Sequence, residues 1–278
     1  DPRRATGAAG RSINLILTTR GLAALDKVGL KHKAQAISVP VHGRLMHNKE
    51  DSETYQQYGW GEQECNYSIN RSAINTLLLE KAESLGVRLS FERELQNIDF
   101  ASKTIIFRDA KQNKEHSVQP SICIGADGAG SKVRQILAKK KSVQVTTSRL
   151  SHDYKELVIP ATSGGKFRLQ KDALHIWPRN HIMLMALPNF DGSFTATIYL
   201  PHKGEDSFSN LNSNEKVDRF FQNHFPDALP LFQSLTSDFL QNPCGELGTV
   251  YTDPWHEEDY CALIGDAAHA IVPFFGQG

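Results

Sequence analysis

The segment that most constrains the fold is the C-terminal stretch from Cys261 to Gly278, which reads CALIGDAAHAIVPFFGQG. The apolar run Tyr260 to Ile264 is typical of a buried strand, and Gly265-Asp266 ends that run. The small side chains of Ala267 and Ala268 then allow the backbone to pass close to a flat or polyanionic group. Such a segment suits a ligand bound at the carboxyl end of a strand, where α/β proteins bind their ligands.

The string from Gly265 to Gly278 closely resembles the flavin-contacting segment of the group A flavoprotein aromatic hydroxylases, and in detail that of the members that act on kynurenine. The resemblance implies that Asp266 holds the ribityl chain of FAD. It also implies that the loop that follows lies beside the isoalloxazine ring. In this loop Gly276 and Gly278 are expected to contact the cofactor, and the substrate contacts are expected to be Pro273, Phe274 and Phe275.

Composition excludes several other classes of function. The 31 basic residues balance 31 acidic ones, so nothing favours a nucleic acid partner. No apolar stretch approaches the roughly 18 residues of a membrane helix. The sequence has no GxSxG, HExxH or P-loop motif, and its 4 cysteines lack metal-binding spacing, so we expect no metal and a reducing compartment. The resemblance implies the mitochondrial outer membrane in a eukaryote or the cytoplasm in a bacterium, and the residues do not choose between them.

The N-terminal region also matches the hydroxylases. Thr18 or Thr19 is predicted to cap a helix that runs to Val28 and is closed by Gly29. Before that helix, the string from Gly10 to Leu15 resembles the family segment that lies along the cofactor, which implies cofactor contacts at Arg11, Ser12 and Ile16. The family begins with a strand, a GxGxxG turn and a helix that are missing here. We therefore expect a fragment, without the N-terminal unit and the C-terminal part, that binds FAD weakly if at all.

Residues 37–67 alternate loosely between apolar and polar, which predicts strands that border a cavity. Arg44 stands among apolar neighbours, where it either pairs with a protein carboxylate or captures a substrate carboxylate through its planar guanidinium. The resemblance identifies Arg44 with the arginine that binds the amino-acid carboxylate, and Tyr58 with its hydroxyl partner.

Asn70 begins the clearest helical pattern, which stops at Gly86 and has an apolar stripe predicted to pack against a sheet: Ile74, Leu77, Leu78, Ala82 and Leu85. Arg71 falls in the first turn of this helix, where a cation opposes the helix dipole and an anion is expected nearby. The resemblance supplies that anion as FAD, whereas the residues alone favour a surface arginine.

Residues 87–126 predict four strands joined by polar turns: Val87 to Phe91, Leu95 to Phe100, Thr104 to Arg108 and Ser121 to Gly125. The last strand leads into Gly125-Ala-Asp-Gly128, and Val133-Arg134 open another helix. A strand, a glycine-rich turn and a helix also describe many ordinary crossovers. This segment resembles the DG motif of the flavin hydroxylases, which is implicated in NADPH use, and the implied cofactor contacts are Leu95, Asp127, Gly128 and Lys132.

From about Val143 the pattern changes to short runs with turn signals, which predicts an antiparallel sheet: Glu156 to Pro160, Lys166 to Leu169, Leu174 to Pro178, Ile182 to Pro188 and Phe194 to Leu200. Alternate side chains are candidates for an apolar wall over an aromatic ligand or for ordinary core packing: Met183, Met185, Leu187, Thr197 and Tyr199. The string that begins at Leu174, LHIWPRN, is nearly identical in the hydroxylases, which favours the wall and adds Leu174 to the substrate contacts.

Together these motifs predict an α/β (α+β) chain in which an incomplete Rossmann-like FAD-binding domain, residues 1–145 and 249–278, is interrupted by an antiparallel substrate domain, residues 146–248. The resemblance implies hydroxylation of L-kynurenine to 3-hydroxykynurenine through a flavin C4a-hydroperoxide, with FAD, NADPH and O₂ and without a catalytic base. Two alternatives stay open: another flavin hydroxylase or epoxidase of the same fold, which has no use for Arg44, and a chain that cannot retain FAD.

Overall fold

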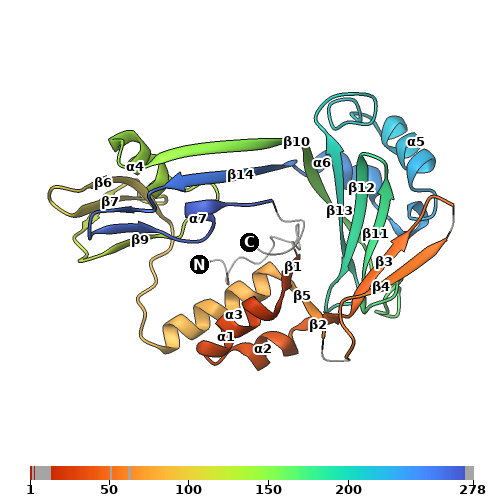
Figure 1. Cartoon of the computed structure of the whole chain (residues 1–278), viewed down its shortest axis with the longest axis horizontal. Helices are drawn as coiled ribbons and strands as arrows, with labels where there is room; N and C mark the ends of the chain where they lie inside the picture. Colours follow the sequence, from red (N-terminus) through yellow and green to blue (C-terminus); the bar gives the residue numbers. More distant parts are fainter. Residues whose placement is uncertain (2, 4–13, 51, 62–63, 273–278) are drawn as a thin grey trace. The chain divides into compact units, whose positions relative to one another are not determined.

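The computed structural model describes residues 1, 3, 14–50, 52–61 and 64–272. The chain divides into two compact units, which are described separately (Figure 1). Unit 1 consists of Asp1–Ala5, Gly86–Leu150 and Leu247–Gly278, and unit 2 consists of Thr6–Leu85 and Ser151–Glu246. The boundaries near residues 150 and 247 lie close to those expected for the interrupting domain. The contacts also group residues 6–85 with the antiparallel sheet, whereas the predicted division placed them in the FAD-binding domain. That division into domains stays a prediction.

Unit 2 is built around strands of a seven-stranded sheet of order β14-β10-β13-β12-β11-β3-β4, in which most of β14 and the first part of β10 belong to the residues of unit 1. Its strands are β3 (Gly43–His47), β4 (Glu53–Gln57), β10 (Gln144–Ile159), β11 (Ala173–Arg179), β12 (Ile182–Pro188), β13 (Phe194–Pro201) and β14 (Gly245–Asp253). Strands β11, β12 and β13 form an antiparallel meander, as predicted, and β3 joins β11 in parallel. The β11–β12 hairpin is tight because Asn180 adopts a φ of 54°, a conformation that asparagine tolerates well.

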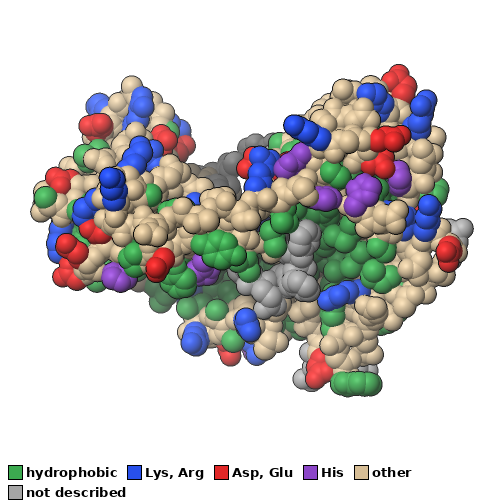
Figure 2. Space-filling view, turned by 45° about the horizontal axis from the view of Figure 1, so that its top comes forward, with side chains coloured by type: hydrophobic (Ala, Val, Ile, Leu, Met, Phe, Trp, Pro, Cys, Tyr) green, Lys and Arg blue, Asp and Glu red, His purple; other side chains and the backbone are tan. Residues whose placement is uncertain are grey.

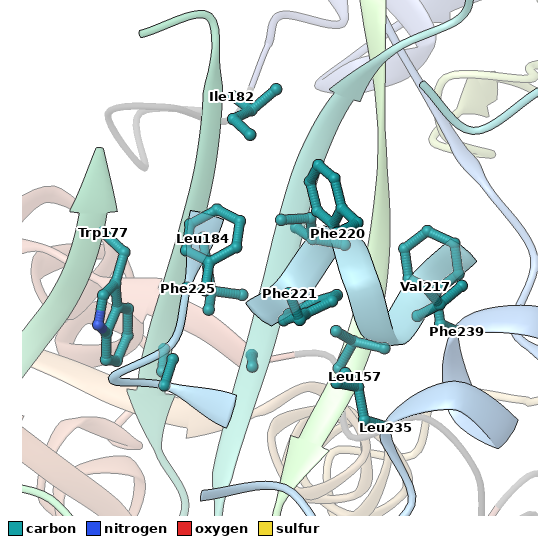
Figure 3. Close-up of a cluster of buried hydrophobic side chains, with 14 of the residues drawn as sticks. Leu157, Trp177, Ile182, Leu184, Val217, Phe220, Phe221, Phe225, Leu235 and Phe239 are labelled. Carbon is teal, nitrogen blue, oxygen red and sulfur yellow. The ribbon is translucent and has the colours of Figure 1, made fainter. Parts of the chain in front are cut away.

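One face of this sheet packs against α5 (Asn214–His224) and α6 (Leu235–Gln241) to form the core of unit 2 (Figure 3). The sheet contributes alternate, fully buried side chains such as Leu157, Leu184 and Ile198, and α5 contributes Phe221. Because side chains alternate along a strand, the residues between these positions lie on the opposite face of the sheet.

A smaller sheet of order β1-β5-β2 lies in the N-terminal part of unit 2, with strands β1 (Asn14–Leu17), β2 (Ser38–Val41) and β5 (Asn66–Asn70). Helices α1 (Thr19–Lys27) and α2 (Lys31–Ala36) follow β1. Helix α1 lies where predicted, with Thr18 at the N-cap position and Gly29 at a φ of 70° after the helix, but it ends at Lys27 and the Thr18 side chain makes no capping hydrogen bond.

Helix α3 (Arg71–Ser84) begins where predicted, because the Asn70 side chain accepts hydrogen bonds from the backbone N–H groups of Ser72 and Ala73 at 2.8 and 3.2 Å. Its apolar stripe is only partly buried. Ile74 is buried and Leu77 packs beside it, whereas Leu78 and Leu85 are 43% and 66% exposed. The expectation that the whole stripe packs against a sheet was therefore wrong for the second half of the helix.

Unit 1 contains a three-stranded meander, β6 (Arg93–Asp99), β7 (Thr104–Asp109) and β8 (Glu115–Val118), and a second sheet of order β15-β16-β9. In the second sheet β9 (Cys123–Gly125) pairs in parallel with β16 (Cys261–Leu263), and β15 (His256–Glu257) pairs with β16 on its other side. Helix α4 (Lys132–Lys140) packs close to β9 at Gly125, where a Cβ would lie 2.9 Å from the Cβ of Val133.

Two predicted strands are absent from the described residues. Residues Val87 to Phe91 form no strand and pair with no other segment there, although their composition is apolar. Residues Lys166 to Leu169 form a loop, in which Phe167 and Leu169 pack against the core of unit 2 and Arg168 donates a 2.8 Å hydrogen bond to the carbonyl of Pro160. Burial of these apolar side chains therefore does not require a strand.

On the face shown in Figure 2, basic and acidic side chains are interspersed. No helix among the described residues is long and apolar enough to cross a membrane.

Candidate functional site

Arg44 lies in the middle of β3, on the face of the seven-stranded sheet opposite the core. Its strand neighbours Gly43 and Leu45 are buried, and Arg44 itself is half-buried. Tyr58 follows β4, and its backbone N–H donates a 2.9 Å hydrogen bond to the carbonyl of His42, which precedes β3. The β3–β4 hairpin therefore brings Arg44 and Tyr58 together, with the Arg44 guanidinium 5.4 Å from the centre of the Tyr58 ring.

The Arg44 and Tyr58 side chains interact directly. Burial raises the pKa of the Tyr58 hydroxyl, and a hydrogen bond and the positive charge of Arg44 oppose that shift. No carboxylate among the described residues lies within 4.0 Å of the Arg44 guanidinium. Within these residues, pairing with a protein carboxylate does not explain this arginine.

The residues expected to form an apolar wall do share one face of the sheet. Arg44 lies opposite Leu174 on β11. Met183 lies opposite Tyr199, Met185 opposite Thr197, and Leu187 opposite Thr195. None of the five wall candidates belongs to the buried cluster on the other face, although Leu187 and Tyr199 are themselves buried.

The two tyrosines on this face of the sheet are partly or fully shielded from water. Tyr199 is 9% exposed, and its ring centre lies 6.2 Å from that of Tyr154 on β10. Burial raises the pKa of both hydroxyls, so both phenols are neutral at physiological pH. The face therefore offers apolar surface, neutral hydroxyl groups, the Arg44 guanidinium and the Glu156 carboxylate, which lies opposite Thr197 and whose charge raises the pKa of both tyrosines. The positive charge of Arg71 acts on Tyr154 in the opposite sense. Of these groups, the Arg44 guanidinium suits the carboxylate of a ligand with an aromatic ring.

A second set of candidate residues lies in unit 1, where two turns leave the same edge of one sheet. Strands β9 and β16 are parallel, with Cys123 opposite Cys261 and Gly125 opposite Leu263. Asp127 and Asp266 follow the carboxyl ends of these neighbouring strands. The two aspartate-bearing turns therefore converge at one edge of this sheet.

Arg134 ties the two turns together. Its Nη1 atom donates to the carbonyl oxygens of Ala267 at 2.7 Å and Asp266 at 3.4 Å, and its Nη2 atom donates to the carbonyl oxygen of Ala129. The side chain is buried; burial lowers the pKa of Arg134, and the negative charge of Asp127 opposes that shift. Sequence reasoning missed this role, although the position of an arginine among the apolar residues Val133 and Ile136 was a signal.

The Asp127 carboxylate is occupied by helix α4. It accepts hydrogen bonds from the Ser131 hydroxyl at 2.6 Å and from the backbone N–H groups of Lys132 and Val133 at 2.7 and 3.1 Å. Burial alone would raise the pKa of Asp127, but these hydrogen bonds outweigh it, so the pKa lies below its usual value. Asp127 thus shapes the turn and caps the helix, and both of its carboxylate oxygens already accept hydrogen bonds.

Asp266 differs from Asp127 in this respect. It is the first residue of the four-residue helix α7 (Asp266–His269), and its side chain is exposed. No hydrogen bond from another described residue reaches its carboxylate. Ala267 and Ala268, directly behind it, are fully buried, and no described atom comes within 4 Å of a Cβ built on Gly128. This edge of the sheet can therefore accept a ligand at Asp266.

The remaining candidates are more dispersed. Ile16 is half-buried on β1, Arg71 is exposed at the start of α3, and Lys132 is exposed at the start of α4. Leu95 packs against the core of unit 1. The other candidates lie outside the described residues: Arg11, Ser12, Pro273, Phe274, Phe275, Gly276 and Gly278. Among the described residues, no group of three His, Cys, Asp or Glu side chains can hold a metal ion.

Comparisons with known proteins identify the family to which the chain belongs. A family model described as "FAD binding domain" matches residues 4–278. Kynurenine 3-monooxygenase of Stenotrophomonas maltophilia (strain K279a) is 43% identical over 278 residues, which is 100% of this chain and 61% of that protein. The enzyme of the same name from Dictyostelium discoideum is 41% identical, over 100% of this chain and 60% of its own length. This chain thus spans about 61% of the length of such relatives.

Solved structures show the same fold at lower identity. The tetrameric form of 2-methyl-3-hydroxypyridine-5-carboxylic acid oxygenase superposes with a TM-score of 0.74 at 19% identity, over 97% of this chain and 68% of that chain. Tetracycline destructase Tet(51) superposes with a TM-score of 0.64 at 16% identity, over 95% of this chain and 66% of that chain. These findings confirm the predicted α/β fold class and the resemblance to flavoprotein hydroxylases. With a family model that matches residues 4–278, the chain belongs to the family described as "FAD binding domain".

Proposed function

We propose that the protein hydroxylates L-kynurenine to 3-hydroxykynurenine, with FAD as cofactor and NADPH and O₂ as co-substrates. The observation that carries this proposal is Arg44, an arginine without a described carboxylate partner, next to Tyr58 and on an apolar sheet face. Kynurenine combines an aromatic ring with an amino-acid carboxylate, and a guanidinium binds a carboxylate through two parallel hydrogen bonds.

The residues of unit 1 fit the cofactor. Asp266 presents an exposed carboxylate without a described hydrogen-bond donor, which suits the hydroxyl groups of a ribityl chain. The small buried side chains of Ala267 and Ala268 let a ligand approach the backbone. When bound, FAD supplies the acceptance of hydride from NADPH and the activation of O₂.

The protein's own residues have three tasks in this proposal. Arg44 and Tyr58 bind the substrate carboxylate and so fix the position of the ring. Met183, Met185 and Tyr199 give an apolar surface that excludes water from the ring. Because the aniline nitrogen of kynurenine activates the adjacent ring carbon, no side chain is required as a general base.

The proposal is tested with the FAD-loaded full-length protein by following NADPH oxidation and product formation with and without L-kynurenine. We expect kynurenine to accelerate NADPH oxidation and 3-hydroxykynurenine to accumulate in proportion to the NADPH consumed. NADPH oxidation that does not respond to kynurenine, without hydroxylated product, would refute this assignment. That result would favour another flavin hydroxylase of the same fold.

A further inference from the structure

A chain of buried polar groups crosses the core side of the β3–β11 strand pair, opposite the Arg44 face. His175 Nε2 lies 2.8 Å from the carbonyl oxygen of Gln170, and His175 Nδ1 lies 2.9 Å from His47 Nε2. His47 Nδ1 in turn lies 3.1 Å from Glu53 Oε1 on β4. The two histidines are 8% and 0% exposed, and the His47 ring stacks on Trp177 at 4.2 Å with planes 9° apart.

The geometry fixes where the protons of this chain lie. The Gln170 carbonyl can only accept, so His175 carries its hydrogen on Nε2. Burial lowers the pKa of His175 to about 4, so its Nδ1 is an acceptor at neutral pH. His47 must therefore donate from Nε2. This leaves His47 Nδ1 and the Glu53 carboxylate as two acceptors that face each other, and their contact requires one further proton between them.

The surroundings make this proton exchangeable. The Glu53 side chain is 59% exposed, so water reaches the outer end of the chain. A cavity of about 210 Å³ adjoins it, lined by residues that include His47, Glu53, Leu169, Trp177, Asp227 and Leu231. The proton can thus pass between solvent and the His47–Glu53 contact without unfolding of the sheet.

Four charged or titratable groups face His47, and together they set when it holds that proton. Burial lowers the pKa of His47, Glu53 and Asp227 raise it, and Arg179 lowers it; the net pKa lies below 6.5. His175, the fourth group, approaches from β11. Arg179 and Asp227 lie 3.3 Å apart and largely offset each other, and Arg179 also donates a 2.8 Å hydrogen bond to the His47 carbonyl.

We propose that Glu53 and His47 form a proton-dependent clasp that holds edge strand β4 against β3 when a proton lies between them and releases β4 when that proton is lost. When the proton leaves to solvent, the His47 lone pair and the Glu53 carboxylate repel each other, and the exposed glutamate turns outward. The clasp closes on acidification and opens at alkaline pH. Because Tyr58 follows β4, the clasp also sets how firmly Tyr58 is held, and its link to substrate binding rests on the proposed function.

Hydrogen exchange in the 278-residue chain tests the clasp without any ligand. The reporters are the amides of Tyr58, which donates to the His42 carbonyl, and Asn48, which donates to the Ser52 carbonyl; both bonds are 2.9 Å and close the β3–β4 hairpin. After correction for intrinsic exchange rates, we expect about threefold more protection at pH 5 than at pH 8, as for a partly exposed ion pair.

Two charge-matched variants make the test specific. Glu53→Gln supplies an amide that donates to neutral His47 Nδ1 at every pH, so protection should stay high and lose its pH dependence. Glu50→Gln removes an exposed carboxylate from the same hairpin and should behave as the unmodified chain. Protection that is independent of pH in the unmodified chain, or equal effects of the two variants, would overturn the clasp.

Ring ¹⁵N spectra provide a second measurement on the same samples. We expect His175 to keep its hydrogen on Nε2, and His47 to change from one protonated ring nitrogen to two as the pH falls. A hydrogen on Nδ1 of His175 would overturn the chain. Because no ligand is added in either experiment, failure of the proposed function would leave both results unchanged.

Discussion

Replacement of Arg134 by methionine tests how the two aspartate-bearing turns are held at one edge of the unit 1 sheet. The methionine side chain keeps most of the buried volume but cannot donate hydrogen bonds. The carbonyls of Ala129 and Ala267 then lose a charged donor, and the carbonyl of Asp266 loses a longer bond of 3.4 Å.

The magnitude follows from these bonds. A hydrogen bond from a charged donor contributes about 1.5 to 3 kcal/mol, so the two stronger bonds account for roughly 4 kcal/mol. Part of this loss of stability is offset, because burial of the Arg134 cation costs free energy, as its lowered pKa indicates. We expect Arg134→Met to reduce the free energy of unfolding by about 3 kcal/mol, and Arg134→Lys, which keeps one donor group, by about half as much.

Urea unfolding of the chain measures this loss, and Lys139→Met serves as the control. Lys139 lies on the same helix and is exposed, so the same change in charge and volume should alter stability by less than about 0.5 kcal/mol. Hydrogen exchange should also show that the Ala268 amide, which bonds the Gly265 carbonyl at 2.9 Å, loses protection in Arg134→Met. Equal stability of Arg134→Met and Lys139→Met would refute the view that Arg134 joins the turns.

Three further substitutions address the cap, the sheet and the cofactor. The pKa of Asp127 is lower in the folded chain than in the unfolded chain, where it is about 3.9, so its ionised carboxylate stabilises the fold above that pH. This stabilisation is lost as the pH falls through the pKa of Asp127 in the folded chain. Asp127→Asn should therefore cost about 1 kcal/mol at pH 7 by urea unfolding and flatten the loss of stability below about pH 4; an unchanged acid profile would contradict this. Gly245→Ala should cost about 1 to 3 kcal/mol in the same assay, because its Cβ would lie 2.2 Å from the Tyr154 ring; no loss would mean that the ring moves freely. Asp266→Ala should weaken FAD binding about tenfold, as measured by flavin fluorescence, because one hydrogen bond to the cofactor is lost. Asp259→Ala, on the exposed turn that precedes β16, should leave FAD affinity unchanged. Equal FAD affinities of the two variants would show that Asp266 is not part of the cofactor site.

Much of the fold could be predicted from local signals. Thr18 and Gly29 mark the two ends of α1, and Asn70 caps α3, because capping depends on neighbouring residues alone. The alternation along β12 and β13 also placed the wall candidates on one sheet face correctly. These signals are local, so they can be read from the sequence without knowledge of the tertiary structure.

Features that depend on distant partners could not be predicted. The burial of Arg134 follows from carbonyls on a segment that returns near the end of the chain, and the contact between His47 and His175 joins residues far apart in sequence. Leu85 is exposed although it fits the helical stripe, because no other described segment covers that end of α3. Such outcomes depend on which elements meet, and the apolar pattern of one element does not contain that information.

The central claim is that Arg44 binds the carboxylate of an aromatic amino acid, and calorimetry tests it most directly. Binding of L-kynurenine and of its decarboxylated analogue is compared for the FAD-loaded full-length protein and for its Arg44→Ala variant, with Arg20→Ala as an exposed control. We predict that Arg44→Ala weakens kynurenine binding by about 2 to 3 kcal/mol and leaves binding of the analogue unchanged, because only the carboxylate meets the guanidinium. Equal losses for both ligands, or no loss for kynurenine, would contradict the account.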